Sequence, residues 1–122
     1  LGHITTFGGH PVSCAAGLAT LKTIVDEDLV NDVETKGELF KSLLKHPAIR
    51  EVRGKGLMIG FEMQAGLEDI RKVLLNDYKI FTGEAKPNVI RLLPSLSISS
   101  SEIDLFLKAL TKASAQILNK AN

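Results

Sequence analysis

The chain has 122 residues, of which 44% are hydrophobic and 24% are charged, a balance typical of one globular domain with a single core. The formal net charge of +1 gives no electrostatic reason to expect a nucleic acid or an anionic membrane as a partner. No apolar run approaches the roughly 20 residues of a membrane-spanning helix. The lone Cys14 excludes an internal disulfide bond and suits a reducing compartment, so we expect a cytoplasmic location.

The cysteine and the three histidines lack the spacing of a zinc site, so no metal is expected. The chain starts with Leu1 and has no signal-like segment at its start, and we expect it to be a piece of a longer polypeptide.

Residues 1–10 carry little core-forming pattern and are predicted to form a loop. A helix is expected to begin near Pro11, because the N–H that proline lacks would be unpaired in a first turn anyway. One face of this helix is apolar, and we expect Cys14 on it to be a small buried hydrophobe. This face consists of Cys14, Leu18, Leu21 and Val25. Asp28 is the expected N-cap of a second helix, which should end before Pro47.

The next segments predict a β-hairpin, in which residues 49–53 and the alternating residues 57–63 flank the turn Gly54-Lys55-Gly56. These glycines open into a strand pattern, so they do not form a dinucleotide-binding loop, which needs a helix at that point. A shorter helix is predicted at 67–76 and strands at 80–82 and 89–93.

The last helix has the sharpest start signal. Ser99 is the expected N-cap and Glu102 completes a capping box. The predicted buried stripe is Ile103, Phe106, Leu107, Leu110, Ala113 and Ile117. The whole order, α-α-β-β-α-β-β-α, predicts an α+β fold in which helices cover one face of a small antiparallel sheet.

Two places suggest binding. Residues 3–11 read HITTFGGHP, and hydroxyl and backbone N–H groups just before a helix suit an anion such as a phosphate. Thr5, Thr6 and the Gly8-Gly9 backbone would surround it, although a loop whose glycines only permit tight turning explains the pattern equally well. Arg91 is the one charge in an apolar strand and either binds a carboxylate or phosphate, or extends to water from an edge strand.

Three segments, in this order and spacing, resemble the class III aminotransferases, which are pyridoxal phosphate enzymes of fold type I. They are GHITTFGGHPVSCAAGLATL (2–21), VRGKGLMIGFEM (52–63) and PNVIRLLPSLSISSSEID (87–104). The acetylornithine and ornithine aminotransferases are the most similar members. The resemblance covers nearly the whole chain but only the C-terminal third of such an enzyme. It implies that residues 1–10 are a loop from the cofactor-binding region of the large domain and that residues 11–122 are the C-terminal small domain.

The resemblance also implies roles for individual residues. Thr6 would contact the phosphate of the pyridoxal phosphate bound by the neighbouring subunit of a homodimer, and Thr5 would share that contact. Arg91 matches the arginine of the R-x-x-P-P-L pattern, which is associated with the substrate carboxylate or with an ion pair that gates the substrate side. The sequence departs from the family where His10 replaces the usual Asn and Ser95 replaces the second Pro.

The Schiff-base lysine of the family, the Asp that pairs with the pyridine nitrogen and the stacking aromatic all lie upstream, and no lysine here has a matching context. The resemblance therefore implies the C-terminal fragment of a transaminase, inactive by itself, whose parent moves an amino group from N-acetylornithine, ornithine or a similar amine to 2-oxoglutarate. The alternative is a stand-alone, non-catalytic α+β binding or dimerisation module.

The two hypotheses predict different surfaces. A fragment should expose apolar surface on the first helix, near Ala15, Ala16 and Ala19, because those residues would pack on the absent large domain. A stand-alone module should instead fold residues 1–10 onto its own domain.

Overall fold

A computed structural model describes residues 5–86 and 88–120, so the first four residues of the predicted loop 1–10 lie outside the described residues. The elements in chain order are α1 (Pro11–Asp26), α2 (Leu29–Leu43), β1 (Ile49–Lys55), β2 (Met58–Met63), α3 (Ile70–Tyr78), β3 (Gly83–Lys86), β4 (Val89–Leu92) and α4 (Ser100–Lys120). This order of helices and strands is the predicted one. Across the described ranges, no helix has the length and apolar character needed to cross a membrane.

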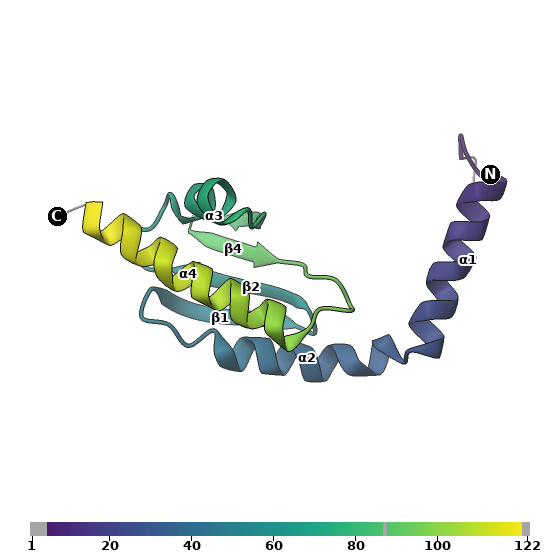
Figure 1. Cartoon of the computed structure of the whole chain (residues 1–122), viewed down its shortest axis with the longest axis horizontal. Helices are drawn as coiled ribbons and strands as arrows, with labels where there is room; N and C mark the ends of the chain where they lie inside the picture. The colour runs from purple at the N-terminus through teal and green to yellow at the C-terminus, as the bar shows by residue number, and fades with distance from the viewer. Residues whose placement is uncertain (1–4, 87, 121–122) are drawn as a thin grey trace.

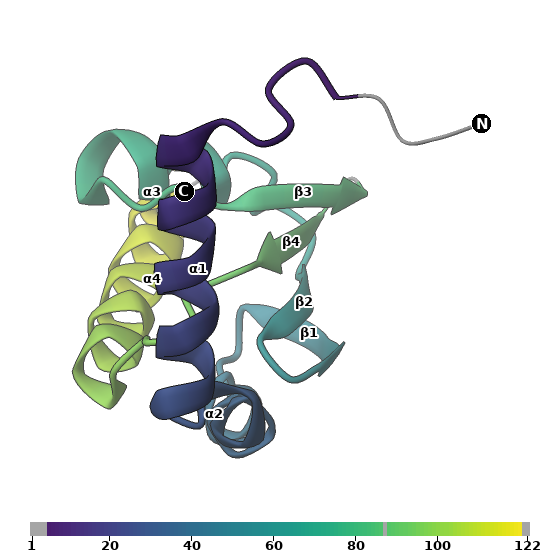
Figure 2. The same ribbon diagram turned by 90° about the vertical axis from the view of Figure 1, so that its right-hand side faces the viewer.

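The four strands form one antiparallel sheet in the order β1-β2-β4-β3. Figure 1 shows α4 lying across one face of this sheet, with α2 and α3 on either side of it. The opposite face carries no helix in either ribbon view (Figures 1 and 2). The predicted α+β architecture, a small antiparallel sheet covered on one face, is confirmed.

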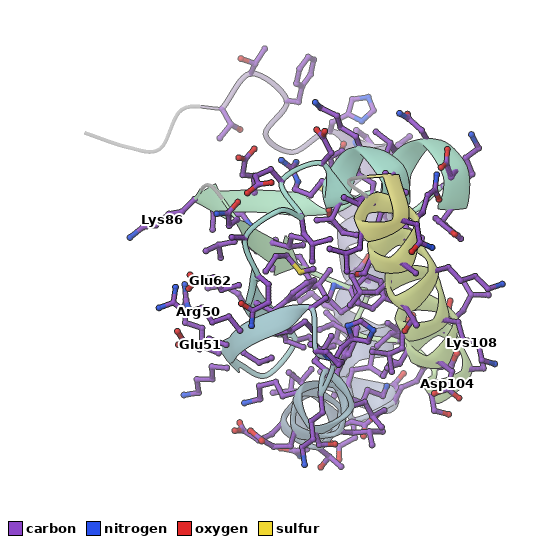
Figure 3. All side chains as sticks on the ribbon, turned by 90° about the vertical axis from the view of Figure 1, so that its left-hand side faces the viewer. Arg50, Glu51, Glu62, Lys86, Asp104 and Lys108 are labelled. Atoms are coloured by element: carbon purple, nitrogen blue, oxygen red, sulfur yellow. The ribbon has the colours of Figure 1, made fainter. Side chains whose placement is uncertain are left out.

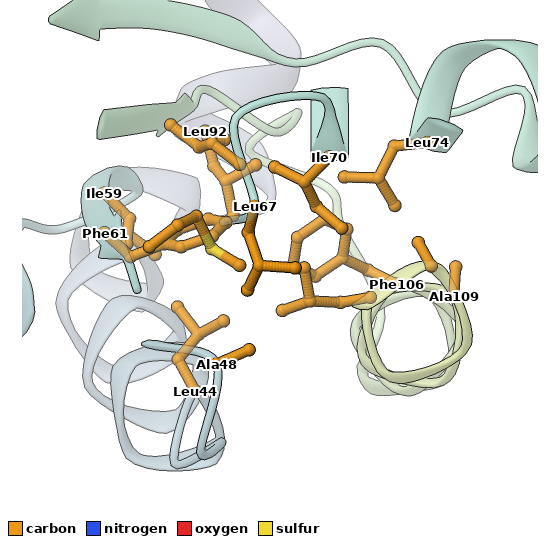
Figure 4. Packing of buried hydrophobic residues seen from close by; sticks show 14 of the residues in the cluster. Leu44, Ala48, Ile59, Phe61, Leu67, Ile70, Leu74, Leu92, Phe106 and Ala109 are labelled. Carbon is orange, nitrogen blue, oxygen red and sulfur yellow. The ribbon is translucent and has the colours of Figure 1, made fainter. Parts of the chain in front are cut away.

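The core lies between the sheet and these three helices, as Figure 4 shows. The predicted alternation in β2 is confirmed, because Ile59, Phe61 and Met63 are buried there. The ring of Phe106 on α4 meets two other rings edge-on, Phe40 at 5.7 Å and Phe61 at 6.2 Å between centroids. Such edge-to-face aromatic pairs add stability beyond the area that they bury.

The hairpin between β1 and β2 needs its glycines. Gly54 and Gly56 have φ values of 146° and 52°, a region that residues with a side chain rarely adopt. A Cβ placed on Gly37 of α2 would collide with the carbonyl group of Gly56. The close approach of α2 to this turn therefore depends on the missing side chain of Gly37. The predicted hairpin is confirmed, but β1 continues through Gly54 and Lys55, so the tight turn lies at residues 56–57 and not at the predicted 54–56.

The capping box at the start of α4 is confirmed atom by atom. The backbone N–H of Ser99 donates to Glu102 Oε2 at 2.8 Å, and the backbone N–H of Glu102 donates to Ser99 Oγ at 3.3 Å. The Ser99 N–H bond, followed by the Ser99 hydroxyl bond, lowers the pKa of the Glu102 carboxyl from its ordinary value of 4.5.

The prediction for Asp28 is correct in position and wrong in chemistry. Asp28 is the N-cap of α2, but its φ is 52° and its side chain caps no backbone N–H. The carboxylate instead accepts a hydrogen bond from the Asn31 side chain at 2.7 Å. In this left-handed conformation the carboxylate contacts the first turn of α2 through a side chain and not through a backbone N–H.

The predicted strand at 80–82 is wrong, because the chain there begins with the hydrogen bond that ends α3 and forms no strand before Gly83. Lys79 takes a left-handed conformation after the helix, and the Ile80 N–H returns to the Leu74 carbonyl at 2.9 Å. These groups are therefore used by the helix end and not by a sheet, and β3 begins at Gly83. The helix itself lies a few residues later than the predicted 67–76.

The first helix stands apart from the core. Figure 2 shows α1 crossing in front of the other elements, and Figure 1 shows that it extends away from them beyond α2. None of its residues is buried, and the exposed fractions of Leu18, Leu21 and Val25 are 62%, 63% and 75%. Cys14 is exposed as well, so the prediction of a buried cysteine is wrong. Its helix face is apolar, but within the described chain nothing covers it.

Candidate functional site

Two consecutive turns lead into α1. The Gly8 N–H donates to the Thr5 carbonyl at 3.3 Å, and the His10 N–H donates to the Phe7 carbonyl at 3.2 Å. Gly9 has a φ of 77°, which favours glycine at this point. All residues from 5 to 10 are exposed. The described part of the predicted loop is confirmed as a loop, and it is not folded onto the domain as a stand-alone module would require.

The start of α1 carries no capping side chain and no acidic residue in its first turn. A Cβ on Gly8 would collide with the Thr5 hydroxyl, so this glycine makes space for that hydroxyl group. The N-cap residue His10 makes no side-chain cap, and the first turn of α1 holds no acidic residue. The positive end of a 16-residue helix is thus not neutralised by a carboxylate from its own first turn. Hydroxyls beside an uncapped helix start fit a phosphate group chemically.

Arg91 lies on the open face of the sheet. It belongs to β4, where its neighbours Ile90 and Leu92 are buried on the helix-covered side, as the predicted alternation requires. β4 runs between β2 and β3, so the interpretation of Arg91 as an edge-strand residue is wrong. The Arg91 side chain is nevertheless exposed, because it points to the open face of the sheet.

The charged groups around Arg91 differ in whether they are paired. Arg53 lies 3.2 Å from the Glu51 carboxylate and 3.9 Å from that of Glu62, which also binds Arg50 at 3.0 Å. Figure 3 shows Arg50, Glu51, Glu62 and Lys86 together on one side of the molecule, away from Asp104 and Lys108 of α4. Among the residues that the structure describes, no carboxylate pairs with Arg91. A free guanidinium in this position can receive the carboxylate of a ligand.

Two hollows meet at Arg91. One of about 310 Å³ lies over the sheet and includes Arg53, Gly60 and Lys86. The other, of about 480 Å³, has mostly apolar walls and includes Gly83, Phe81 and the α4 residue Glu102. Sequence reasoning found Arg91 but missed the glycines beside it. The alternation in β2 puts Gly60 on the open face, whereas the misplaced strand at 80–82 hid Gly83.

The structure does not bring the two predicted parts of the site together within one chain. Thr5 and Thr6 precede α1, which extends away from the sheet that carries Arg91 (Figure 1). Neither hollow at Arg91 is lined by a residue from 5–10. In the described ranges, no group of three or more His, Cys, Asp or Glu side chains is placed to hold a metal ion.

Sequence comparison places the chain among known proteins. The profile of the family described as Aminotransferase class-III matches residues 1–114. The acetylornithine aminotransferase of Streptomyces coelicolor is 40% identical over 111 residues, a match that covers 88% of this chain and 28% of that enzyme. Ornithine aminotransferase 2 of Staphylococcus aureus strain N315 is 42% identical over 109 residues, which is 87% of this chain and 27% of that enzyme. The chain thus spans less than a third of the length of these relatives.

Solved structures show the same fold. A transaminase with L-alanine superimposes with a TM-score of 0.81 and 27% identity, over all of this chain and 32% of that one. The ornithine aminotransferase of Toxoplasma gondii, in which pyridoxal phosphate partly occupies the active site, gives a TM-score of 0.76 and 28% identity over 97% of this chain and 30% of that one. The chain belongs to the class III aminotransferases, a family of transaminases that depend on pyridoxal phosphate.

Proposed function

We propose that this chain is the C-terminal part of an aminotransferase that moves an amino group from N-acetylornithine, ornithine or a similar amine to 2-oxoglutarate. The donor class is supported by the relatives named acetylornithine and ornithine aminotransferase. The observation that carries the proposal is the uncovered α1, a 16-residue helix whose apolar face has no partner in the described chain. Contiguous exposed apolar faces mark interaction surfaces.

The proposal divides the chain into two parts. Residues 1–10 belong with the large domain that binds the cofactor, and residues 11–122 form the small domain. The large domain covers α1, including its apolar face, and the small side chains of Ala15, Ala16 and Ala19 elsewhere on the helix permit a close approach. The exposed state of residues 5–10 supports this division, since their partners are then outside the chain.

Each binding residue has a definite task in the proposed enzyme. Thr6 and Thr5 donate hydroxyl hydrogen bonds to the cofactor phosphate, and the uncapped start of α1 adds a favourable field. The cofactor is the one held by the neighbouring subunit of a homodimer. Arg91 holds the substrate carboxylate in an orientation that its exposed position on the open sheet face allows. Pyridoxal phosphate, when bound, supplies the electron sink for the reaction.

This chain supplies binding and orientation but not the covalent anchor. No lysine in it has the sequence context of the family's Schiff-base lysine, and the groups that bind the pyridine ring lie upstream in the family. The chain alone is therefore inactive, and its contribution is to complete one side of a site formed elsewhere.

The test is cofactor retention. The 122-residue chain is mixed with pyridoxal phosphate, reduced with borohydride and weighed intact by mass spectrometry. We expect at most scattered, substoichiometric labelling of surface lysines. One cofactor fixed per chain at a single lysine would contradict the proposal, because it would show a complete anchor within this chain.

A second experiment addresses the threonines in the enzyme that carries this chain as its C-terminal part. Thr6→Val should weaken binding of pyridoxal phosphate about tenfold, the loss expected for one hydrogen bond to a charged group. Thr20→Val is the control, because the Thr20 hydroxyl only bonds the Ala16 carbonyl within α1 at 2.9 Å. Equal cofactor affinity in the Thr6 variant and the parent would remove Thr6 from the site.

A further inference from the structure

Arg91 has a glycine on each side of it in the sheet. The strand register pairs Arg91 with Gly60 of β2 and with Gly83 of β3. Residues paired across antiparallel strands point to the same face of the sheet. On the open face, the guanidinium of Arg91 is therefore flanked by two positions that carry no side chain.

The two glycines differ in what lies above them. A Cβ on Gly83 would be 3.2 Å from Arg91 Nε and 3.3 Å from the Arg91 carbonyl oxygen, both tighter than ordinary packing, with Arg91 Nη2 at 3.4 Å. A Cβ on Gly60 would have its nearest neighbours in Arg53 and Val89 at 3.9–4.0 Å, which is ordinary contact. The guanidinium thus occupies the space above Gly83 and leaves the space above Gly60 open.

The backbone conformation does not require glycine at either position. Gly60 and Gly83 are not among the described glycines with positive φ, so a residue with a side chain fits the backbone at both. A substitution at Gly83 therefore acts through the side chain that it places against Arg91. A substitution at Gly60 adds the same atom to the same sheet face without that contact.

We propose that Gly83 is the positioning residue for Arg91: by lacking a side chain it seats the guanidinium over β3, beside the 480 Å³ apolar hollow. A side chain at this position moves the guanidinium toward the open side above Gly60. Because paired N–H donors bind a carboxylate only in a defined orientation, this displacement lowers the affinity of Arg91 for a carboxylate ligand.

The hollow also indicates the class of ligand. Its exposed walls include Phe81, Leu93 and Leu105, and Arg91 lies at its margin without a partner carboxylate among the described residues. This combination suits a carboxylate carried on an aliphatic chain. The ligand assignment rests on the proposed aminotransferase function, whereas the steric relation between Gly83 and Arg91 does not.

The first test follows Arg91 directly in the 122-residue chain. The Nε–Hε resonance of Arg91, assigned through Arg91→Lys, is recorded by ¹⁵N NMR in Gly83→Ala, Gly83→Val and Gly60→Ala. We expect the resonance to shift in Gly83→Ala, to shift further in Gly83→Val and to stay in place in Gly60→Ala. An unchanged resonance in Gly83→Val, or an equal shift in Gly60→Ala, would overturn the positioning role.

The second test uses the enzyme that carries this chain. Gly83→Val should raise KM for the carboxylate-bearing amino donor about tenfold or more, with kcat within about twofold, and Gly60→Ala should change KM by less than Gly83→Ala does. Gly83→Ala, which needs only a small shift of the guanidinium, should give an intermediate KM. A loss of kcat at unchanged KM would contradict the assignment. An enzyme without transaminase activity would refute the proposed function, and the NMR measurement would still decide the role of Gly83.

Discussion

The helices α1 and α4 have similar patterns of apolar residues, but the apolar face of α1 is exposed and that of α4 is buried. Both present an apolar row at helical spacing. In α4 the row packs into the core, with Ile103 and Leu110 at 1% and 0% exposure, whereas no residue of α1 is buried. The difference shows that the spacing of apolar residues determines which face of a helix can pack against another element. The spacing does not determine whether the element that packs on this face belongs to the same chain.

The contrast between the core and α1 is tested most strongly by removing one apolar side chain from each and measuring the free energy of unfolding. Phe61→Ala should lower the free energy of unfolding by about 3–5 kcal/mol, because Phe61 is fully buried and its loss leaves a cavity. Leu21→Ala on α1 should change it by less than about 0.5 kcal/mol. Urea unfolding of both variants checks the pair, and a large effect at Leu21 would mean that α1 packs on the core.

Two helical glycines give a second matched pair. Gly37→Ala should cost about 1–3 kcal/mol, because its Cβ would meet the Gly56 carbonyl and force α2 away from the hairpin. Gly17→Ala on α1 has nothing within 4 Å to meet, and alanine is the better helix former. We expect Gly17→Ala to keep the urea midpoint and to increase the helical circular dichroism slightly. The comparison fails if the two substitutions destabilise the chain equally.

The two helix starts should also respond differently to the loss of a side chain. Ser99→Ala removes the cap of α4 and should lower the free energy of unfolding by about 1 kcal/mol. His10→Ala removes no cap at the start of α1 and should leave thermal stability unchanged. Thermal unfolding followed by circular dichroism measures both variants. A stability loss at His10 as large as that at Ser99 would contradict the capping assignment.

The smallest effect concerns pH. The folded chain lowers the pKa of Glu102, so its stabilising effect is fully present above the ordinary value of 4.5 and is lost as pH falls through the lowered pKa. Glu102→Gln should therefore be less stable than the parent near neutral pH, and the difference should shrink below about pH 4.5. A difference that stays constant down to pH 3 in urea titrations would show that the charge of Glu102 is not involved.

The elements that the sequence predicted well are those whose determinants are local. The capping box at Ser99 and the alternation through Phe61 depend on residues within a few positions, and both are confirmed. The strand at 80–82 failed because Lys79 and Ile80 finish α3 through a bond to Leu74, a use of the backbone that the apolar pattern does not reveal. The burial of Cys14 failed because it depends on a partner that a helical pattern cannot identify.

The candidate site shows the same limit. The residue types and the resemblance indicated Thr5, Thr6 and Arg91, whose binding roles stay predictions. The interior position of β4 and the glycines beside Arg91 came only from the strand register, because neighbours in a sheet are far apart in sequence.

The most direct test of the account is the reactivity of Cys14, which lies on α1 and is the only cysteine of the 122 residues. Its rate of reaction with a thiol reagent is measured in this chain and, by peptide mass mapping, in the proposed full-length enzyme. The account predicts a rate close to that of a short cysteine peptide in the chain alone and strong protection in the enzyme. Protection in the chain alone, or equal rates in both, would contradict the claim that α1 awaits a partner from outside this chain.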